Sequence, residues 1–539
     1  ALIFLLLQFL AIENKVSQTS TRTIIIAAAV SLAWALHPVN VTNILYIVQR
    51  MNSLSALFVL SGMICYIQGR MALGVSPLKG WLFITSSILI FLPLAWFSKE
   101  NGALLPLFLF ILEITIFRFS GLNSRQCKGL YLFHVVFFLL PSLLAVFYIL
   151  HHAGMFQAGY DNRHFNMMER LITEPRVIWL YIRMIVLPAP SAFGLFHDDI
   201  PISTSLTEPM TTIPAIAGLA GLFLVAVASI KRWPIVSFGL LFFFSGHLME
   251  SSFIPLEIAF EHRNYLPSIG ILLPIFYFLG HEGEQSKYAR VRSAVMLLFI
   301  IIFALQTHLR AWTWSDNVRL YMTEVGYHPN SPRANYEAGK IFGQNLERGV
   351  GNPQLNYQEA IKYFEKSTEL RDNITSGLFG TIVASIDSGH KIKPVWIDEL
   401  EFRLANQPME QVNLLWLDKF TECVSKGLCR KEDLQVPRLV NAAISYQNVN
   451  NKNKSQMYAI LAKYTYQVEG NRSKTVEIAR KAVSTLPSNI HHQLNLVEYL
   501  IWAEDRVGAE KVLKSAARID IYGRYTAEIS RLMKTLESQ

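Results

Sequence analysis

Charged residues are scarce in this sequence: Asp, Glu, Lys and Arg make up 17% of its 539 residues, against about 25% in soluble domains. Cysteine is also scarce, with four residues and no C-x-x-C pair, which argues against a thiol oxidoreductase. The chain has no His-rich zinc pattern and no Walker phosphate-binding loop, so a zinc fold and an ATPase are poorly supported. Hydrophobic residues make up 52%, a composition typical of a membrane protein.

Polarity divides the chain into two parts. Residues 1–309 consist mostly of apolar runs, and residues 310–539 contain no run long enough to cross a bilayer. We therefore predict an all-α protein with a polytopic membrane domain (1–309) and a soluble helical domain (310–539). The first apolar run stops at Ile12 and has no initiator Met or basic segment before it. We expect the sequence to start within a membrane helix, so that a helix and the first outer loop precede Ala1.

The apolar runs and the charges between them predict a topology. Membrane helices are expected near 1–12, 23–36, 52–69, 81–97, 103–117, 129–150, 211–230, 234–249, 267–280 and 293–309. Basic residues fall in every second connection: Lys15, Arg22, Arg70, Lys79, Arg118, Arg125, Lys128, Lys231, Arg232, Lys287, Arg290 and Arg292. By the positive-inside rule these connections are cytoplasmic. The alternate connections and the C-terminal domain then face the periplasm or a lumen.

One of the outer connections, residues 151–210, is unusually long. Its apolar stretch 177–187 is interrupted by Arg183 and ended by two prolines. Counting it as a crossing would reverse every later loop, so we predict a helix that lies in the interface or enters it shallowly. Trp312 and Trp314, at the end of the last apolar run, are predicted interfacial anchors.

A period of 34 residues indicates helical repeats in the C-terminal domain. Tyr466, Ala479, Ala482 and Pro487 occupy the spacing of a tetratricopeptide repeat, and Tyr499, Gly508, Val512 and Ser515 follow one period later. A looser copy contains Gly339, Phe342, Ala360 and Phe364, with an insertion in its turn. The alternative is a generic helical array with coincidental spacing. Either array forms a concave surface suited to protein contacts.

The two cysteines of the C-terminal domain, Cys423 and Cys429, lie close together in the sequence. They form a disulfide in an oxidising compartment or remain two free thiols, and the spacing leaves both open.

Ionisable residues gather in the predicted outer connections. Arg50, Lys99, Arg183 and Arg263 lie where basic residues are normally rare; each one alone is explained by snorkelling, but together they suggest an anionic ligand such as a phosphate. Carboxylates accompany them at Glu100, Asp198, Asp199, Glu257 and Glu261. These either neutralise charge at helix ends or include a general base. "HDD" at 197–199 is a weak candidate for binding Mg²⁺ or Mn²⁺.

Four ordered stretches carry a family resemblance: "LHPVNVTNILYIVQRMNSLSALF" (36–58), "SKENGALLPLFLFILE" (98–113), "ERLITEPRVIWLYIRMIVLPAPSAFGLFHDD" (169–199) and "FEHRNYLPSIG" (260–270). With the repeats, they resemble bacterial tetratricopeptide-repeat membrane proteins that are similar to the transmembrane-and-tetratricopeptide-repeat O-mannosyltransferases. The resemblance implies a GT-C fold that moves a sugar from a polyprenyl-phosphate or polyprenyl-diphosphate donor to an acceptor at the outer face. The catalytic acid of such enzymes usually lies in the first outer loop, which here would precede Ala1.

These observations predict a site and a cellular setting. Asp198, Asp199 and Glu261 are the visible catalytic candidates; Arg50, Lys99, Arg183 and Arg263 are predicted to bind the donor phosphate; and His37, Glu100, His197, His262 and Tyr265 are predicted to orient donor or acceptor. We expect a protein acceptor or partner on the repeat domain and a location in a bacterial inner membrane with the C-terminal domain in the periplasm. The net charge of +9 belongs largely to the inner loops and predicts no nucleic-acid partner. The alternatives are a membrane-anchored scaffold for envelope or pilus assembly and a flippase for a lipid-linked sugar.

Overall fold

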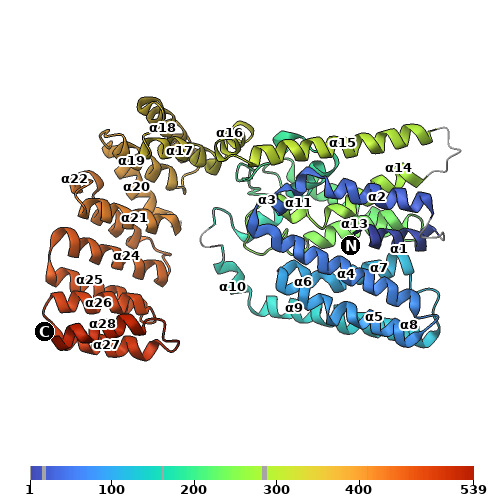
Figure 1. The fold of residues 1–539 in the computed structure, drawn as a ribbon, viewed down its shortest axis with the longest axis horizontal. Helices are drawn as coiled ribbons and strands as arrows, with labels where there is room; N and C mark the ends of the chain where they lie inside the picture. Colours follow the sequence, from blue (N-terminus) through green and yellow to red (C-terminus); the bar gives the residue numbers. More distant parts are fainter. Residues whose placement is uncertain (1, 15–19, 161–162, 282–287, 409–410, 539) are drawn as a thin grey trace. The chain divides into compact units, whose positions relative to one another are not determined.

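The computed structural model describes residues 2–14, 20–160, 163–281, 288–408 and 411–538, and within these ranges every regular element is helical. The prediction of an all-α protein is confirmed. The chain forms two compact units, Ala1–Tyr160 with Phe165–Pro329 and Asp161–His164 with Asn330–Gln539 (Figure 1). The predicted division into a membrane domain and a repeat domain at residue 309 stays a prediction. Lys15 and Lys287, used for the topology, lie outside the described residues.

The first half of unit 1 consists of apolar helices joined by short turns. Several of them continue through a turn of 3-10 or π-helix, labelled η. In chain order they are α1 (Leu2–Asn14), α2 (Thr21–Ala35), η1 (Pro38–Asn40), α3 (Val41–Leu45), η2 (Ile47–Gln49), α4 (Arg50–Ala72), α5 (Pro77–Leu89), α6 (Phe91–Ser98), η3 (Glu100–Leu104), α7 (Leu105–Leu112), η4 (Glu113–Phe117), α8 (Ser124–His134), η5 (Val135–Leu139) and α9 (Leu140–His151).

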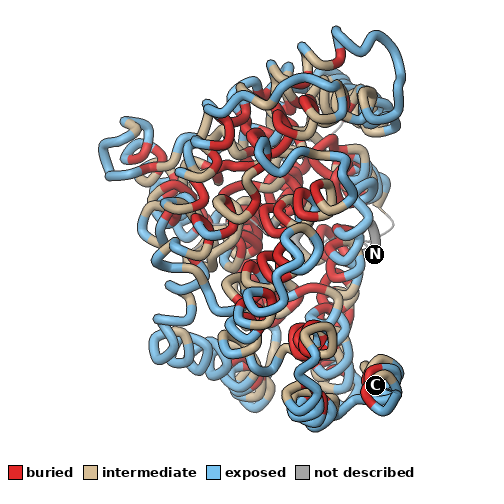
Figure 2. Tube along the Cα trace, turned by 90° about the vertical axis from the view of Figure 1, so that its left-hand side faces the viewer, coloured by how far each residue is buried: buried red, intermediate tan, exposed pale blue. Residues whose placement is uncertain are grey.

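The second half of unit 1 adds longer connections between its apolar helices. Its elements are α10 (Ala153–Ala158), α11 (Met167–Val186), η6 (Pro190–Ala192), α12 (Thr212–Ala228), α13 (Pro234–His247), η7 (Glu261–Asn264), α14 (Ser268–His281), α15 (Ala289–Trp314) and α16 (Asn317–Tyr327). The buried residues of this unit form one large apolar core, from Leu2 to Phe303, with a smaller one around Tyr181. Figure 2 shows buried segments of the trace, in red, gathered in the interior and exposed segments, in pale blue, around them.

Each predicted membrane run coincides with a helix of unit 1. Five helical stretches are long and apolar enough to cross a membrane, and a sixth is added if the bent pair Thr21–Ala35 and Pro38–Leu45 counts as one span. The five are Ile47–Ala72, Pro77–Ser98, Glu100–Phe117, Ser124–His151 and Ala289–Trp314. Three further helices, α12, α13 and α14, are apolar but shorter. Unit 1 therefore has the helices of a multi-pass membrane protein.

The stretch predicted as an interfacial helix, 177–187, is the second half of a longer helix. α11 begins at Met167, where the Asn166 side chain accepts from the Glu169 amide and the Glu169 side chain accepts from the Asn166 amide. This reciprocal capping box fixes the start of the helix. Pro175 lies inside α11. α11 is not among the candidate spans of the described residues.

A buried ion pair lies near the C-terminal end of α4. Arg70 Nε donates to Glu113 Oε2 at 3.0 Å, and the Tyr66 hydroxyl donates to the same oxygen at 2.8 Å. The other carboxylate oxygen accepts from the Phe119 amide at 3.2 Å. Because both carboxylate oxygens are satisfied, this pair has the form of a structural element that ties α4 to the end of α7.

Unit 2 is a series of antiparallel helices, coloured olive to red in Figure 1. They are α17 (Pro332–Glu347), α18 (Pro353–Glu369), α19 (Ser376–Asp387), α20 (Pro394–Asn406), α21 (Gln411–Ser425), α22 (Lys431–Leu434), α23 (Val436–Ser445), α24 (Asn451–Tyr464), η8 (Thr465–Glu469), α25 (Arg472–Thr485), α26 (Ile490–Trp502), α27 (Arg506–Ile519) and α28 (Thr526–Ser538). α17 packs on α18, α24 on α25 and α26 on α27. Helix pairs are therefore present where the period placed them, and their assignment as tetratricopeptide repeats stays a prediction.

Small residues allow the helices of unit 2 to pack closely. A Cβ atom on Gly339 would lie 2.7 Å from the Phe364 ring, and one on Gly380 would lie 2.6 Å from it. The turn between α17 and α18 contains Gly349 and Gly351, whose φ angles of 64° and 75° lie in the left-handed region. The insertion predicted from the sequence is accommodated in this turn and in the start of α18.

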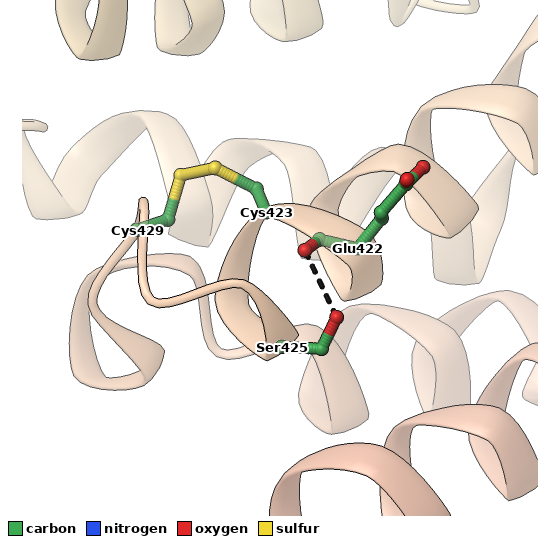
Figure 3. The surroundings of a disulfide bond; sticks show 4 residues. All are labelled: Glu422, Cys423, Ser425 and Cys429. Atoms are coloured by element: carbon green, nitrogen blue, oxygen red, sulfur yellow. Dashed lines mark hydrogen bonds between the residues drawn. A yellow bond between two sulfur atoms is a disulfide. The ribbon is translucent and has the colours of Figure 1, made fainter.

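Cys423 and Cys429 form a disulfide, which resolves the choice that the sequence left open (Figure 3). Cys423 lies in the last turn of α21, and Cys429 follows the end of that helix. The chain reverses at Gly427, which has a φ of 70°, so the two Cα atoms come within 5.3 Å. The other two cysteines, Cys65 and Cys127, are free.

Candidate functional site

The stretch Glu261–Asn264 forms one turn of 3-10 helix, η7, and all four of its side chains are buried. A buried charge is costly unless it is paired and hydrogen-bonded, so these side chains require partners from elsewhere in the chain. Glu261 and Arg263 belong to two different groups of ionisable residues. We call them the acidic cluster (Asp199, His197, Glu261, Arg310, Glu324 and His328) and the basic cluster (Lys99, Arg170, Glu174, Glu250 and Arg263).

Glu261 is the centre of the acidic cluster. Its Oε2 accepts from Arg310 Nη2 at 2.8 Å, and its Oε1 accepts from the Gly194 amide at 2.7 Å. His197 Nε2 lies 3.5 Å from Oε1. Burial favours the protonated form, but Arg310 and His197 outweigh it and lower the pKa of Glu261. The carboxylate is therefore ionised and its oxygens are already engaged.

Arg310 joins three segments at this point. It lies near the end of α15, donates to the Pro38 carbonyl as well as to Glu261, and its guanidinium lies 4.4 Å from the centre of the Phe193 ring. Guanidinium groups combine hydrogen bonding with stacking in this way because they are planar and delocalised. Arg310 thus ties the "HPVN" stretch and the loop around Phe193 to α15.

A carboxylate and a histidine form a second pair in the acidic cluster. His328 Nδ1 lies 2.9 Å from Asp199 Oδ2. Burial favours the neutral forms of both, yet their mutual attraction dominates, so the pKa of Asp199 is lowered and that of His328 is raised. Glu324, one helical turn before His328, accepts from the Leu195 amide at 2.8 Å. Burial raises the pKa of Glu324.

Lys99 and Glu250 form the first ion pair of the basic cluster. Lys99 Nζ donates to Glu250 Oε1 at 2.7 Å, and both side chains are less than 10% exposed, at 6% and 9%. Burial alone would raise the pKa of Glu250, but Lys99 and Arg263 lower it to about 2. Glu250 is thus an ionised partner for these cations.

Two arginines of the basic cluster hold the loop that follows α13. Arg263 donates to the carbonyls of Ile258 and Glu257 at 2.8 and 2.6 Å. Arg170, on α11, donates to the carbonyls of Ser252 and Glu250 at 2.8 and 2.7 Å. Multiple backbone acceptors around a guanidinium partly compensate for its lost hydration. The loop and η7 are therefore fixed by the cations themselves.

The basic cluster contains more cations than anions. Glu174 lies 2.7 Å from Arg170, and burial raises its pKa to about 7 in spite of Arg170 and Arg263. Lys99, Arg170 and Arg263 are all buried, and only two carboxylates, Glu174 and Glu250, accompany them in this cluster. Because Glu174 is readily protonated near neutral pH, the positive charge exceeds the negative charge and favours an additional anion.

A small cavity of about 30 Å³ lies beside the basic cluster and is lined by Asn52, Ser55, Asn101, His262, Arg263 and Tyr265 among others. This volume accommodates one or two waters. His262 stacks on Phe260 with ring centres 5.0 Å apart, and burial, assisted by Lys99, lowers its pKa to about 3. His262 and Tyr265, both predicted to orient substrate, thus lie with Arg263 at one cavity.

Other predicted site residues are placed apart or are already engaged. His37 accepts from the Val39 amide through Nδ1 and contacts the Ile185 carbonyl through Nε2 at 2.9 Å, so it caps η1. Arg50 donates to the Ile44 carbonyl at 3.1 Å and is exposed. Arg183 and Glu100 are exposed, and Asp198 is half-buried. The roles predicted for these residues stay predictions.

The metal prediction gains no support from the side chains around Asp198 and Asp199. Across the described ranges, no group of three or more His, Cys, Asp or Glu residues is arranged to hold a metal ion. Asp199 is instead paired with His328. Binding of Mg²⁺ or Mn²⁺ at "HDD" stays a prediction.

Several residues of the two clusters were not predicted from the sequence: Arg170, Glu174, Glu250, Arg310, Glu324 and His328. Most are single charges next to apolar runs, which look like ordinary helix-end charges. A local signal existed for two pairs. Arg170 and Glu174 are four residues apart within α11, a spacing that places both side chains on one face. Glu324 and His328 have the same spacing, with Glu324 in the last turn of α16 and His328 directly after its end.

The chain matches no protein-family model, but curated proteins are similar to it. It is 22% identical over 354 residues to protein O-mannosyl-transferase F38B6.6 of Caenorhabditis elegans, covering 62% of this chain and 46% of that protein. It is 21% identical over 396 residues to human protein O-mannosyl-transferase TMTC3, covering 63% and 39%. The chain resembles the TMTC-type protein O-mannosyltransferases. The Drosophila melanogaster Tmtc3 protein gives 22% over 401 residues, covering 67% and 42%.

The predicted resemblance to this family is thereby confirmed. The chain spans less than half the length of each of these relatives, at 46%, 39% and 42%.

Proposed function

We propose that the protein is a GT-C type membrane glycosyltransferase that modifies hydroxyl groups of proteins at the outer face of the membrane. The donor is a sugar linked to a polyprenyl phosphate or diphosphate. The observation that carries the proposal is η7, a single turn whose Glu261 enters an acidic cluster while its Arg263 enters a basic cluster with excess positive charge. Similarity to proteins named as O-mannosyltransferases supports the same reaction class.

The reaction requires an anion-binding group and a proton acceptor close together. The acceptor oxygen forms a bond to the anomeric carbon, the bond between that carbon and the phosphate oxygen breaks, and the polyprenyl phosphate leaves with the electron pair. The hydroxyl proton passes to a base. Cations near the leaving phosphate stabilise the charge that develops there.

The basic cluster supplies the phosphate-binding part in this proposal. Arg263 lines the small cavity together with His262 and Tyr265, and Lys99 is buried in the same cluster as Arg263. Their excess positive charge is held in place before any ligand arrives, which is the arrangement that favours a transition state over a ground state. Arg50 and Arg183, which are exposed, are proposed to meet the donor from the membrane surface.

The acidic cluster supplies the proton acceptor. Asp199 orients His328 through Nδ1 and raises its pKa, so His328 suits general-base catalysis near neutral pH. Glu261 stays ionised and holds Arg310 and the Gly194 amide. We propose Asp199, Asp198 and Glu261 as the catalytic carboxylates, with Asp199 acting through His328.

Unit 2 contains a groove suited to a polypeptide acceptor. Its volume is about 400 Å³, and its polar lining residues include Asp418, Lys452, Asn453, Lys463, His491 and Asn495. Amide and ammonium side chains can hydrogen-bond an extended peptide backbone without strict sequence requirements. We propose that this tetratricopeptide-like unit holds the acceptor protein in the periplasm of a bacterial cell.

The experiment that tests the proposal is intact-mass analysis of exported proteins from cells that lack the gene and are complemented with variants. Asp199→Asn keeps the size of a side chain that is 22% exposed, so it is expected to fold. Asp398→Asn, at an exposed carboxylate of unit 2, is the matched control. The expected result is loss of a hexose-sized or larger mass in the deletion and in D199N, but not in D398N.

Two other results would overturn the proposal. Unchanged protein masses with a normal pool of lipid-linked sugar would indicate a non-enzymatic scaffold. Unchanged masses with that lipid accumulating on the inner face would indicate a flippase.

A further inference from the structure

A separate cavity of about 290 Å³ lies where α15 meets α16. Gln306, Arg310 and Thr313 line it from α15, and their spacing of four and three residues places them on one face of that helix. Leu320, Glu324 and Tyr327 line it from α16 with the same spacing. Two helix faces at a bend thus form the walls, and Pro190 and Phe193 close one side.

The lining of this cavity combines aromatic rings with hydrogen-bonding groups. Phe193, Trp312, Trp314 and Tyr327 supply the rings. Arg310 and Glu324 supply charged groups, and both are engaged elsewhere, Arg310 with Glu261 and Glu324 with the Leu195 amide. Pockets of this kind, mostly apolar with a few converging polar groups, are typical of small-molecule sites.

One polar atom in this lining lacks a partner. Gln306 Oε1 is shielded from solvent and accepts no hydrogen bond from any described residue. Leaving a buried acceptor unsatisfied costs free energy that a ligand hydroxyl would recover. The cavity therefore favours a ligand that brings hydrogen-bond donors.

The charges restrict the class of ligand further. Arg310 disfavours a cation, and its pairing with Glu261 removes the need for an anion. A hydrocarbon chain would leave Gln306 Oε1 unsatisfied. A neutral ring with apolar C–H faces and hydroxyl edges matches both the aromatic and the polar lining. We propose that the α15–α16 cavity is a saccharide-binding site that accommodates one sugar residue of a glycan.

This proposal adds a binding site to the proposed function. It rests on that function, because the function is the reason for choosing mannosides as probes. The site shares Arg310 and Glu324 with the acidic cluster, so a sugar bound here lies beside the groups proposed to activate the acceptor. The cavity is accordingly placed to recognise a sugar already carried by the acceptor or just transferred to it.

Binding is measured on the full chain in lipid nanodiscs by following tryptophan emission while methyl α-mannoside, methyl α-glucoside or a mannosyl-serine peptide is added. Trp312→Phe and Trp314→Phe assign the signal to the cavity. The expected result is a saturable change for at least one saccharide, with affinity roughly tenfold weaker in Gln306→Leu. His308→Ala, an exposed neighbour on α15 outside the cavity lining, is expected to bind like the original protein.

Three results would overturn this proposal: no saturable change with any saccharide, equal binding by Q306L and the unchanged chain, or a response only to a polyprenyl lipid without sugar.

A second variant, Thr323→Val, controls for a folding defect in Q306L, and both variants must have a normal melting temperature. Normal protein glycosylation by a chain that binds no saccharide here would refute the cavity alone. Saccharide binding without any transfer would refute the proposed function and leave the cavity standing.

Discussion

Lys99 Nζ lies 2.7 Å from Glu250 Oε1 although 151 positions separate them in the sequence. The pair joins the connection after α6 to the loop after α13, and both side chains are buried. Arg70 and Glu113 form another buried ion pair of unit 1, near the C-terminal end of α4, which can be compared with it.

Replacing Lys99 with Met is expected to reduce both stability and transfer. Loss of one partner leaves Glu250 buried and unpaired, which costs about 3–5 kcal/mol, and loss of the cation from the proposed phosphate site lowers transfer roughly a hundredfold. The double variant K99M/E250Q should recover much of the melting temperature but not the transfer rate.

Arg70→Met is the matched control for that prediction. It also breaks a buried pair, with Glu113, so it should lower the melting temperature while transfer per folded molecule stays near normal. If K99M/E250Q transfers sugar at the original rate, Lys99 is a structural residue and its proposed role is wrong.

Arg310→Met is expected to raise the pKa of Glu261, because Arg310 is the main group that opposes the effect of burial. A lowered carboxyl pKa stabilises the fold above the unfolded value, and this stability is lost as pH falls through the folded pKa. In R310M the folded and unfolded pKa values of Glu261 lie closer together, so the melting temperature should be below that of the unchanged chain near about pH 7, and the difference should shrink toward about pH 3. Melting curves between about pH 3 and 7 measure this.

The control for Arg310 is Arg319→Met. Arg319 stacks on Trp312 at 3.5 Å and donates to a backbone carbonyl, and it is not in the acidic cluster. It should leave the acid limb of the melting curve in place. An R310M curve that overlays the unchanged one would contradict the pairing.

The Asp199–His328 pair is expected to stabilise the fold most within a limited range of pH. The lowered pKa of Asp199 gives stability that is lost as pH falls through it, and the raised pKa of His328 gives stability that is lost as pH rises through it. The pair therefore contributes most between these two values. His328→Asn should abolish the decrease in melting temperature on the alkaline side, which is measured from about pH 5 to 9. The control is His390→Asn, at an exposed histidine of unit 2, which should retain this decrease.

Removing the disulfide is expected to loosen the end of α21. Cys423 and Cys429 are six positions apart, and closing such a short loop contributes about 2 kcal/mol in the chain-entropy description. Reduction of the full chain, or the variant C423S/C429S, should increase tryptic cleavage after Lys426 and Arg430. Reductant should have no further effect on C423S/C429S, and equal cleavage with and without the bond would contradict its stabilising role.

The helices of unit 1 were predictable because apolar runs are a local property of the sequence. α4 and α15 coincide with their predicted runs and extend a few residues into polar flanks. α13 begins with its predicted run and ends at His247, before the predicted end at residue 249. Only the apolar half of α11 was predicted, because its first half is polar, although the capping pair Asn166 and Glu169 marks its start.

The site was predictable only in part, for a physical reason. The "EHRN" turn was visible as a cluster of charge between apolar runs, but its partners were not, since Arg310 lies 49 positions after Glu261. Ion pairs of this kind depend on how the helices pack against one another. In the sequence, a single charge at a helix end does not indicate which distant residue it will pair with. The disulfide was undecided for a similar reason: its geometry depends on where α21 ends, at Ser425.

Because Glu261 and Arg263 lie on one short turn, a change at one cluster is expected to affect the other. Both residues lie within the single 3-10 turn Glu261–Asn264, and each side chain is held by a different cluster. An anion that draws Arg263 toward it would shift Glu261 and its hold on Arg310, and release of that anion would restore both. The turn would then couple the proposed phosphate site to the acidic cluster, and by thermodynamic reciprocity a ligand at either site would alter the affinity at the other by the same factor.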